Sequence, residues 1–214
     1  HLSKVLRMQA GRELILFDGH GGEYSAIISA VGKKVVSVEL GDFSSIDRQS
    51  PLSIHLGIGI SRGERFDHVL QKATELGVTT ITPLFSERTE VKLSGPRLEK
   101  KQLHWQQILI SSCEQCQRNR LPELSAPLNL DQWLPTVDEQ QRFVLHHRSD
   151  VTLSHEPAPN SVALAIGPEG GLSEFEIEAS KKFGFQSLTL GPRVFRTETA
   201  PLTAISLMQY LWGD

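Results

Sequence analysis

Residues 166–171 read Ile-Gly-Pro-Glu-Gly-Gly, and residues 190–200 read Leu-Gly-Pro-Arg-Val-Phe-Arg-Thr-Glu-Thr-Ala. Each stretch follows an apolar run typical of a strand and precedes a run typical of a helix. Glycine lets the backbone approach a ligand closely, and proline fixes the local path of the chain. The two stretches therefore predict rigid loops whose backbone amides and carbonyls line a binding site. A cofactor with a polar base and an amino-acid head suits such a site.

Neither loop carries a standard nucleotide-binding motif. The first lacks the Lys-Ser/Thr ending of a P-loop, and its Glu169 would repel phosphate. Gly57-Ile58-Gly59 lacks the third glycine of the dinucleotide-binding pattern. From the pattern alone, two ordinary helix-entry turns without a ligand are an equal alternative. Ligands of α/β folds do bind beyond the carboxyl ends of the strands, where both loops are expected.

The 214 residues predict two domains with a boundary near residue 48. Short strand-like runs with tight turns over residues 12–40 indicate a small β-barrel, and residues 41–51 have the composition of a linker. Beyond it, strands alternate with helices, which predicts an α/β domain with a mainly parallel sheet. The expected helices span 64–76, 97–117, 174–183 and 200–212, and the expected strands span 54–60, 79–84, 143–146, 162–166 and 188–190. Ser173 and Glu176 predict a capping box for the third helix.

Charge is unevenly distributed along the chain, although the net charge is only −3. Residues 62–120 carry 10 basic and 7 acidic side chains, whereas residues 121–214 carry 6 and 12. A generic nucleic-acid binder is therefore disfavoured, but the middle third could form a local basic patch. No apolar run approaches the length that spans a membrane, so no membrane partner is expected.

The two cysteines, Cys113 and Cys116, form a single C-x-x-C motif in a helix-like stretch. A structural zinc site needs a second pair of ligands, and none has suitable spacing, so no metal is expected. Reduced thiols fit a cytoplasmic location, with metal or redox chemistry as the alternative.

The two glycine-proline loops resemble those of SPOUT-class methyltransferases, and more narrowly those of the ribosomal RNA small-subunit methyltransferase E family. His1 to Arg7 with Leu16-Phe17-Asp18-Gly19 resemble the family's N-terminal barrel. Family members usually begin upstream of His1, so the barrel is expected to lack its first strand. Further stretches resemble the family's middle motifs, in the family's order: Ser61-Arg62-Gly63-Glu64-Arg65, Glu75-Leu76-Gly77-Val78, Pro83-Leu84-Phe85-Ser86-Glu87-Arg88 and Glu114-Gln115-Cys116-Gln117-Arg118-Asn119-Arg120.

The resemblance implies a PUA-like β-barrel in residues 1–48 and a SPOUT domain in residues 49–214 that ends in a trefoil knot. It implies S-adenosylmethionine-dependent methylation of N3 of a uridine in 16S rRNA of the small ribosomal subunit. It also implies a homodimer through the knot helices, which would use the stripe Leu202, Ile205, Met208 and Trp212. Plain core packing explains that stripe equally well. The alternatives are a SPOUT enzyme acting on tRNA and a non-catalytic protein that binds RNA or assists ribosome assembly.

The resemblance also implies which residues hold the cofactor, largely through main-chain groups. They come from three loops: Leu145 and His146; Ile166, Gly167, Pro168, Glu169, Gly170 and Gly171; and Leu190, Gly191, Val194, Phe195, Arg196 and Thr197. For His146 and the adjacent His147, the alternative is two surface histidines at a strand end.

Methylation at N3 of uracil requires loss of the N3 proton, so a base and an anion-stabilising group are useful. Arg196 and Arg193 are the candidates for stabilising the anion, and Glu198 is the candidate base. The alternative role for Glu198 is to complement the dipole of the last helix.

The candidates for RNA contact are basic residues of the barrel and the middle third: Arg7, Arg62, Arg65, Arg88, Lys92, Arg118 and Arg120. Contacts of this kind go to phosphates and position the RNA without reading its sequence. The alternative for each is a solvated side chain with local ion pairs.

Overall fold

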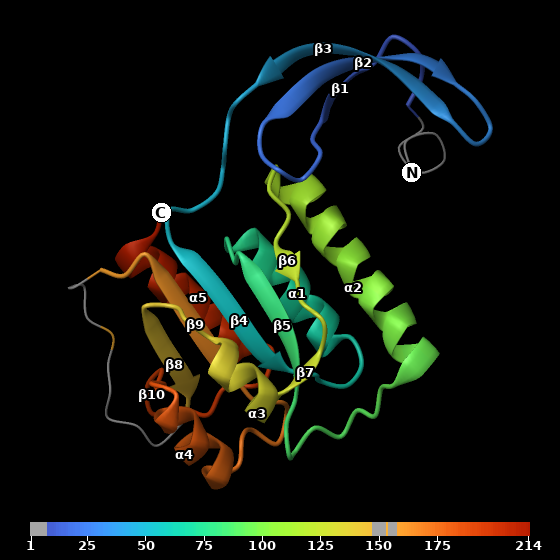
Figure 1. The fold of residues 1–214 in the computed structure, drawn as a ribbon. Helices are drawn as coiled ribbons and strands as arrows, with labels where there is room; N and C mark the ends of the chain where they lie inside the picture. Colours follow the sequence, from blue (N-terminus) through green and yellow to red (C-terminus); the bar gives the residue numbers. More distant parts are fainter. Residues whose placement is uncertain (1–7, 147–152, 154–157) are drawn as a thin grey trace. The chain divides into compact units, whose positions relative to one another are not determined.

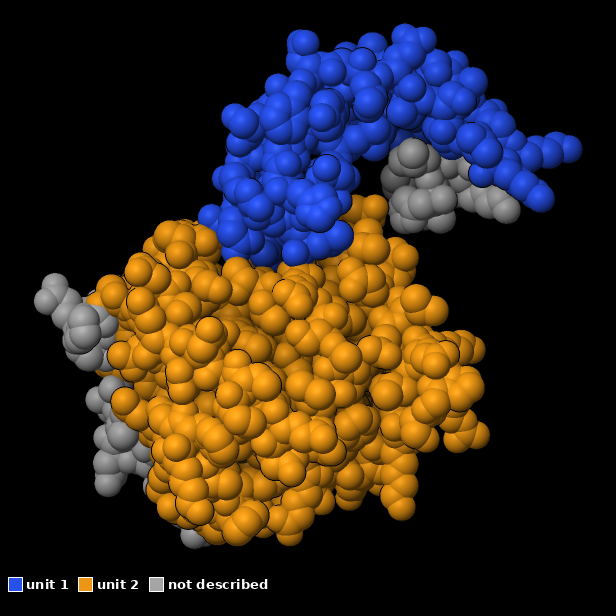
Figure 2. All heavy atoms as spheres, viewed as in Figure 1, with its two compact units in different colours: residues 1–49, 117–121 blue, residues 50–116, 122–214 orange. Residues whose placement is uncertain are grey.

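The computed structural model describes residues 8–146, 153 and 158–214. Arg7 and His147 lie outside the described residues. The chain divides into two compact units (Figure 2). One comprises residues 1–49 and 117–121, and the other comprises residues 50–116 and 122–214. The sequence did not indicate that the short segment 117–121 belongs with the N-terminal residues.

The first unit is built on an antiparallel sheet of three strands in the order β1-β2-β3 (Figure 1). The strands are β1 (Glu13–Leu16), β2 (Glu23–Val31) and β3 (Val36–Ser44). Segment 117–121 joins this unit through backbone hydrogen bonds, in which Gly21 N donates to Asn119 O at 3.0 Å and Leu121 N donates to Gly19 O at 3.0 Å.

The expected linker at 41–51 was wrong in its first part, because β3 continues to Ser44. Pairing with β2 explains the difference. Asp42 N donates to Ser25 Oγ at 3.0 Å, and the rings of Tyr24 and Phe43 lie 5.0 Å apart. Polar residues that look like a linker in sequence thus extend an edge strand.

The second unit is built on a seven-stranded sheet whose recorded pairs are all parallel. Its main path is β10-β8-β9-β4-β5-β6, with β7 also paired to β5. The mainly parallel α/β fold expected from the sequence is therefore confirmed. The strands are β4 (Ser53–Gly59), β5 (Thr80–Phe85), β6 (Glu123–Leu124), β7 (Leu128–Asn129), β8 (Gln141–Leu145), β9 (Ser161–Ile166) and β10 (Gln186–Leu188).

The expected helices are present, with ends within two residues of the predicted ones. They are α1 (Arg65–Glu75), α2 (Gly95–Cys116), α4 (Glu174–Lys182) and α5 (Thr199–Trp212). The capping box is confirmed, since Glu176 N donates to Ser173 Oγ at 3.2 Å and Ser173 N donates to Glu176 Oε2 at 2.8 Å. Sequence analysis missed β6, β7, α3 (Leu130–Trp133) and the 3-10 turn η1 (Leu134–Thr136), because each is too short to show a period.

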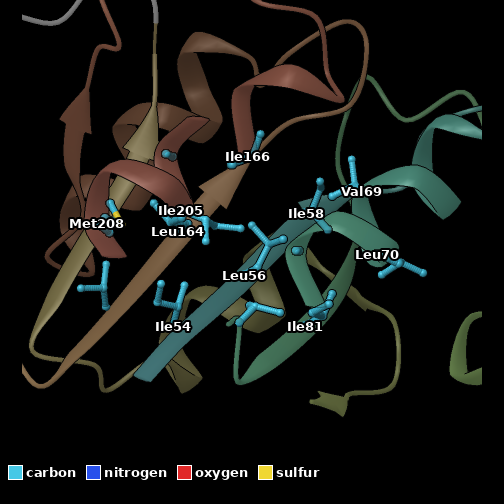
Figure 3. Close-up of a cluster of buried hydrophobic side chains, with 14 of the residues drawn as sticks. Ile54, Leu56, Ile58, Val69, Leu70, Ile81, Leu164, Ile166, Ile205 and Met208 are labelled. Carbon is cyan, nitrogen blue, oxygen red and sulfur yellow. The ribbon is translucent and has the colours of Figure 1, made fainter. Parts of the chain in front are cut away.

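The side chains of strand β4 point alternately to the two faces of the sheet, and each face is covered by its own apolar core. Ile54, Leu56 and Ile58 are fully buried and face the core formed with α1, α2 and α5 (Figure 3). A second core gathers α3, α4 and the alternate residues of the neighbouring strands, such as Ala163 and Ala165 of β9. The sheet is thus covered by helices on both faces, as parallel sheets usually are.

Helix α5 belongs to the first of these cores. Ile205 and Met208 are 0% exposed within a single chain, so these two members of the stripe are core residues. The exposed apolar side chains of this helix are Leu207 and Tyr210. The alternative of plain core packing therefore holds for the centre of the stripe.

Four polar side chains, those of His55, Thr82, Trp133 and Glu139, form a partly buried network beside β4. Trp133 Nε1 donates to His55 Nε2 at 3.2 Å, and His55 Nδ1 lies 2.7 Å from Glu139 Oε1. Because Nε2 accepts, the imidazole proton sits on Nδ1 and points at the carboxylate. Burial alone would raise the pKa of Glu139, but the hydrogen bond from His55 and those from the backbone of residues 139 and 138 lower it below its ordinary value.

We expect Gly57→Ala to destabilise the second unit by about 1–3 kcal/mol, as overpacking does. A Cβ at this position would meet Trp133 Cη2 at 2.4 Å. Urea denaturation of the variant measures the loss. Trp133→Phe removes the ring atoms that clash. In that background, Gly57→Ala should therefore lower the free energy of unfolding by less than it does in wild type. An equal loss in both backgrounds would show that the clash is not the cause.

We expect the Glu139–His55 pair to make stability depend on pH. The folded-state pKa of Glu139 is lowered, so its contribution is present at neutral pH and is lost as pH falls through the folded-state value. Glu139→Gln should cost about 1–3 kcal/mol at pH 7. The difference from wild type in urea denaturation should shrink below about pH 4, and a constant difference would contradict the assignment.

Candidate cofactor site

The candidate site lies at the carboxyl edge of three neighbouring strands. In the order β10-β8-β9, each strand is parallel to the next, so the loops that follow them share one edge of the sheet. These loops carry the residues that the sequence analysis selected. They enclose a pocket of about 310 Å³.

The pocket brings together nearly all of the predicted cofactor residues. It is lined by Leu145, His146, Ile166, Gly167, Pro168, Glu169, Gly170, Gly171, Leu190, Gly191, Val194, Phe195 and Thr197, and also by the predicted catalytic residue Arg193. Arg196 is the exception among the predicted cofactor residues, since it is exposed and does not line the pocket. Further lining residues that sequence analysis missed are Arg88, Leu172, Glu174, Ile177, Leu188, Thr189 and Ala200. Most of the missed residues adjoin the selected loops in sequence, which is the signal that could have found them.

The first loop follows a path that only small residues allow. A Cβ at Gly167 would meet Gly171 C at 2.5 Å, and Gly171 itself has a φ of +66°. On its other side the loop presses on β4, because a Cβ at Gly59 would meet Pro168 N at 2.4 Å. Gly171 N donates to Pro168 O at 2.8 Å and closes the turn. The loop therefore offers backbone groups, rather than side chains, to a ligand.

Arg88 holds this loop from the segment after β5. Its Nη1 donates to Gly170 O at 2.8 Å and to Leu172 O at 3.3 Å. Next to it, Glu87 N donates to Glu176 Oε1 at 2.8 Å. Arg88, one of the residues predicted to contact RNA, is exposed, and its guanidinium also holds two loop carbonyls.

Glu169 connects the first loop to the start of α1. Its Oε1 accepts from Arg62 N at 2.8 Å and from Arg65 Nη1 at 3.3 Å. Burial alone would raise the pKa of Glu169, but these donors lower it below its ordinary value, so the carboxylate is ionised near neutral pH. The contact orients the Glu169 carboxylate toward α1.

The second loop runs from Leu190 into the start of α5. Gly191 has a φ of +104°, a conformation that favours glycine. Thr199 N and Ala200 N both donate to Arg196 O at 3.0 Å, so Arg196 begins the first turn of the helix. The Glu198 carboxylate is in the same turn, with Oε2 4.0 Å from Arg65 Nε.

His146 lies at the end of β8 with its side chain 13% exposed. Its Nε2 is 3.8 Å from Glu174 Oε1, and both residues line the pocket. The alternative of a surface histidine is therefore wrong for His146. In the part of the chain that the structure describes, no group of three potential ligands is placed to hold a metal ion.

The remaining basic candidates differ in their surroundings. Lys92 and Arg62 are exposed, and Arg62 Nη2 lies 2.8 Å from Glu90 Oε2. Arg120 Nε lies 2.6 Å from Asp47 Oδ2, and this hydrogen bond lowers the pKa of Asp47. Arg118 is buried and donates to Gln49 Oε1 at 2.7 Å. A phosphate contact does not agree with the buried position of Arg118, which instead braces the first unit.

Among the described residues, no helix is both long and apolar enough to cross a membrane. Cys113 and Cys116 are free thiols, the first buried and the second partly buried.

Comparison with known proteins shows similarity to RNA methyltransferases. The RNA methyltransferase domain model matches residues 48–209, and the RNA methyltransferase PUA domain model matches residues 1–41. Ribosomal RNA small subunit methyltransferase E of Buchnera aphidicola subsp. Schizaphis graminum is 38% identical over 100% of this chain and 88% of the relative. The protein of the same name from Bacillus subtilis is 30% identical over 98% and 86%.

Two solved structures with S-adenosylmethionine are similar throughout. A methyltransferase from Legionella pneumophila is 46% identical, with a TM-score of 0.97 over 100% of this chain and 89% of that chain. A ribosomal RNA small subunit methyltransferase E from Neisseria gonorrhoeae is 38% identical, with a TM-score of 0.92 over 99% and 88%. From its sequence and its fold, this chain belongs to the ribosomal RNA small subunit methyltransferase E family.

Proposed function

We propose that the protein is an S-adenosylmethionine-dependent methyltransferase that modifies N3 of a uridine in 16S rRNA of the small ribosomal subunit. The observation that carries this proposal is the pocket of about 310 Å³ formed by three adjacent loops at the carboxyl edge of the sheet. Relatives with closely similar chains are named for rRNA methylation, and two of the similar structures contain S-adenosylmethionine. The further parts of the proposal are a PUA-like barrel in the first unit, a trefoil knot, a homodimer through the knot helices and a cytoplasmic location.

The residues present fit this cofactor. A side chain at Gly167 or Gly59 would clash with the first loop, so these glycines allow the loop path that lines the pocket. Ile166, Leu188 and Leu190 supply apolar surface for a flat base, and the ionised Glu169 also lines the pocket, with its carboxylate held by Arg62 N and Arg65. Bound S-adenosylmethionine would supply a methyl group that is attached to a positively charged sulfur. On transfer of the methyl group, this sulfur would become part of a neutral thioether.

The proposed role of the chain's own residues is to prepare the acceptor. The N3–H bond of uracil breaks and its proton passes to the Glu198 carboxylate, while a new bond forms from N3 to the methyl carbon. Arg196 and Arg193 stabilise the negative charge that develops on the uracil ring. Arg65 lies 4.0 Å from Glu198 and 3.3 Å from Glu169, so a single guanidinium positions both carboxylates.

Methyl transfer to small ribosomal subunits that lack their uridine methylation tests this function directly. With labelled S-adenosylmethionine, we expect one 3-methyluridine in 16S rRNA, identified by nucleoside mass. Transfer to tRNA instead would support the tRNA alternative. Cofactor binding without transfer to any RNA would contradict the proposed acceptor, and absence of cofactor binding would leave an RNA-binding protein.

We expect Arg196→Ala to lower kcat by about 10²-fold, the usual cost of losing one anion-stabilising group. Because Arg196 does not line the pocket, the Kd for S-adenosylmethionine should stay unchanged. Isothermal titration and single-turnover methylation measure the two quantities. If the variant keeps the wild-type kcat, Arg196 does not stabilise the developing charge on the uracil ring.

We expect Arg88→Gln to weaken cofactor binding by about tenfold, since two loop carbonyls lose a charged donor. Lys92→Gln is the matched control, because Lys92 is a nearby exposed cation outside the pocket lining. The control should keep the wild-type Kd for cofactor and lose affinity for RNA only. Equal cofactor affinity in Arg88→Gln and wild type would show that the loop holds its shape without Arg88.

A further inference from the structure

One side of helix α2 carries a row of basic residues that the sequence analysis did not select. Arg97, Lys100, Lys101 and His104 recur at i, i+3, i+4 and i+7, the spacing that places residues on one side of a helix. The acidic residue of this stretch, Glu99, is one or two positions from its neighbours in the row and therefore lies off it. These four residues are called the basic face of α2 below.

The basic face is accessible to solvent and carries an excess of positive charge. Arg97 and Lys100 are exposed, and the side chains of Lys101 and His104 are 39% and 50% exposed. The carboxylate that meets this face is Asp67 of α1, with Oδ2 2.7 Å from His104 Nε2 and Oδ1 3.6 Å from Lys101 Nζ. Among the described residues, no ion pair engages Arg97 or Lys100. One carboxylate thus faces four basic positions.

The energetics of the helix itself do not account for these cations. The backbone dipoles make the start of a helix positive, so acidic residues stabilise the first turn and basic residues stabilise the last turn. The first turn of α2 contains Arg97 and no acidic residue, and its last turn contains no basic residue. The basic face therefore lies at the end of the helix where it stabilises the fold least. This placement points to a role outside the packing of the chain.

The basic face lies at the edge of the sheet that carries the cofactor loops. Strand β4 is parallel to both β9 and β5, so the three strands end at one edge. Helix α2 starts from this edge, because residues 86–94 connect it to the end of β5 (Figure 1). RNA that approaches the cofactor loops therefore comes to the edge where α2 begins.

Arg62 connects the basic face to the first cofactor loop. Lys101 and Arg62 line the same cavity at the start of α1. Arg62 N donates to Glu169 Oε1 at 2.8 Å, and Glu169 lines the cofactor pocket. The side chain of Arg62 is 65% exposed, although Glu90 Oε2 lies 2.8 Å from its Nη2. Exposed basic side chains are thus found from α2 to the segment that holds the cofactor loop.

We propose that the basic face of α2 binds phosphate groups of the RNA substrate, an inference that rests on the proposed function. Each phosphate of RNA carries a negative charge, and cations that neutralise phosphates gain affinity by releasing counterions. At 1.5 Å of rise per residue the face is about 10 Å long, so it can meet more than one phosphate. Phosphate contacts position RNA and do not read its sequence. The basic face therefore orients the RNA at the edge of the cofactor loops and leaves the choice of base to other groups.

The double variant Arg97→Gln/Lys100→Gln tests this surface. Both residues are exposed, and loss of cations near the start of α2 should leave thermal stability unchanged or slightly higher. We expect the Kd for unmethylated 16S rRNA to rise about tenfold at about 0.15 M salt, and the salt slope to fall by about 0.7 for each lost contact. Filter binding at several salt concentrations measures both. Unchanged affinity and slope would overturn the proposal and leave the surface to an acidic protein partner.

Lys181→Gln/Lys182→Gln is the matched control. It removes two exposed cations from the last turn of α4, a helix that starts after β9 at the carboxyl edge of the sheet and runs away from it. The change in net charge is the same, but the site is remote from the cofactor loops, so the Kd for RNA should stay near the wild-type value. If the control loses as much affinity as the α2 variant, net charge explains the effect and the proposal fails.

Steady-state methylation distinguishes this inference from the proposed function. In the α2 variant, KM for RNA should rise about tenfold, while kcat and the Kd for S-adenosylmethionine stay unchanged, because neither residue lines the cofactor pocket. If RNA is methylated with an unchanged KM, the surface inference fails and the methyltransferase function stands. If the α2 variant binds 16S rRNA more weakly than wild type but wild type methylates no RNA, the proposed function fails and the binding surface stands.

Discussion

The close approach between Gly59 and Pro168 is the constraint on which the cofactor loop depends. A Cβ at residue 59 would lie 2.4 Å from the proline nitrogen, so the loop can rest on β4 only because that strand carries hydrogen there. Two residues earlier, Gly57 gives the same room to Trp133. The opposite face of β4 carries Ile54, Leu56 and Ile58 and anchors the strand in the larger core. One strand thus combines an apolar face buried in the core with a face on which two glycines leave room for Trp133 and the cofactor loop.

Charged side chains then hold the two C-terminal loops in the conformation that their glycines allow. Arg88 binds two carbonyls of the first loop, and Arg65 connects that loop, through Glu169, to Glu198 at the start of α5. These contacts come from segments far apart in sequence, namely the ends of β5 and β4 and the two C-terminal loops. The pocket is therefore preorganised by ion pairs and hydrogen bonds that hold its glycine-rich loops. Preorganisation of this kind lowers the cost of ordering a ligand.

The sequence was sufficient for the parts of the fold that depend on local pattern. The strand-to-helix loops, the capping box of α4 and the long helices follow from residues that lie next to one another. Their assembly into one pocket also followed, because the carboxyl ends of parallel strands meet at one edge. The roles of the arginines did not follow. Arg88 and Arg118 look like the other cations in sequence, and only long-range contacts show that Arg88 also holds the first loop and that Arg118 is buried against Gln49.

This division among the cations changes how RNA binding is to be understood. Within the middle third, Arg118 is buried and donates to Gln49, whereas the side chains of Arg62, Arg65 and Arg120 are 65%, 51% and 49% exposed although each lies beside a carboxylate. Each phosphate contact made from solution contributes to salt-dependent affinity, whereas an internal arginine contributes none.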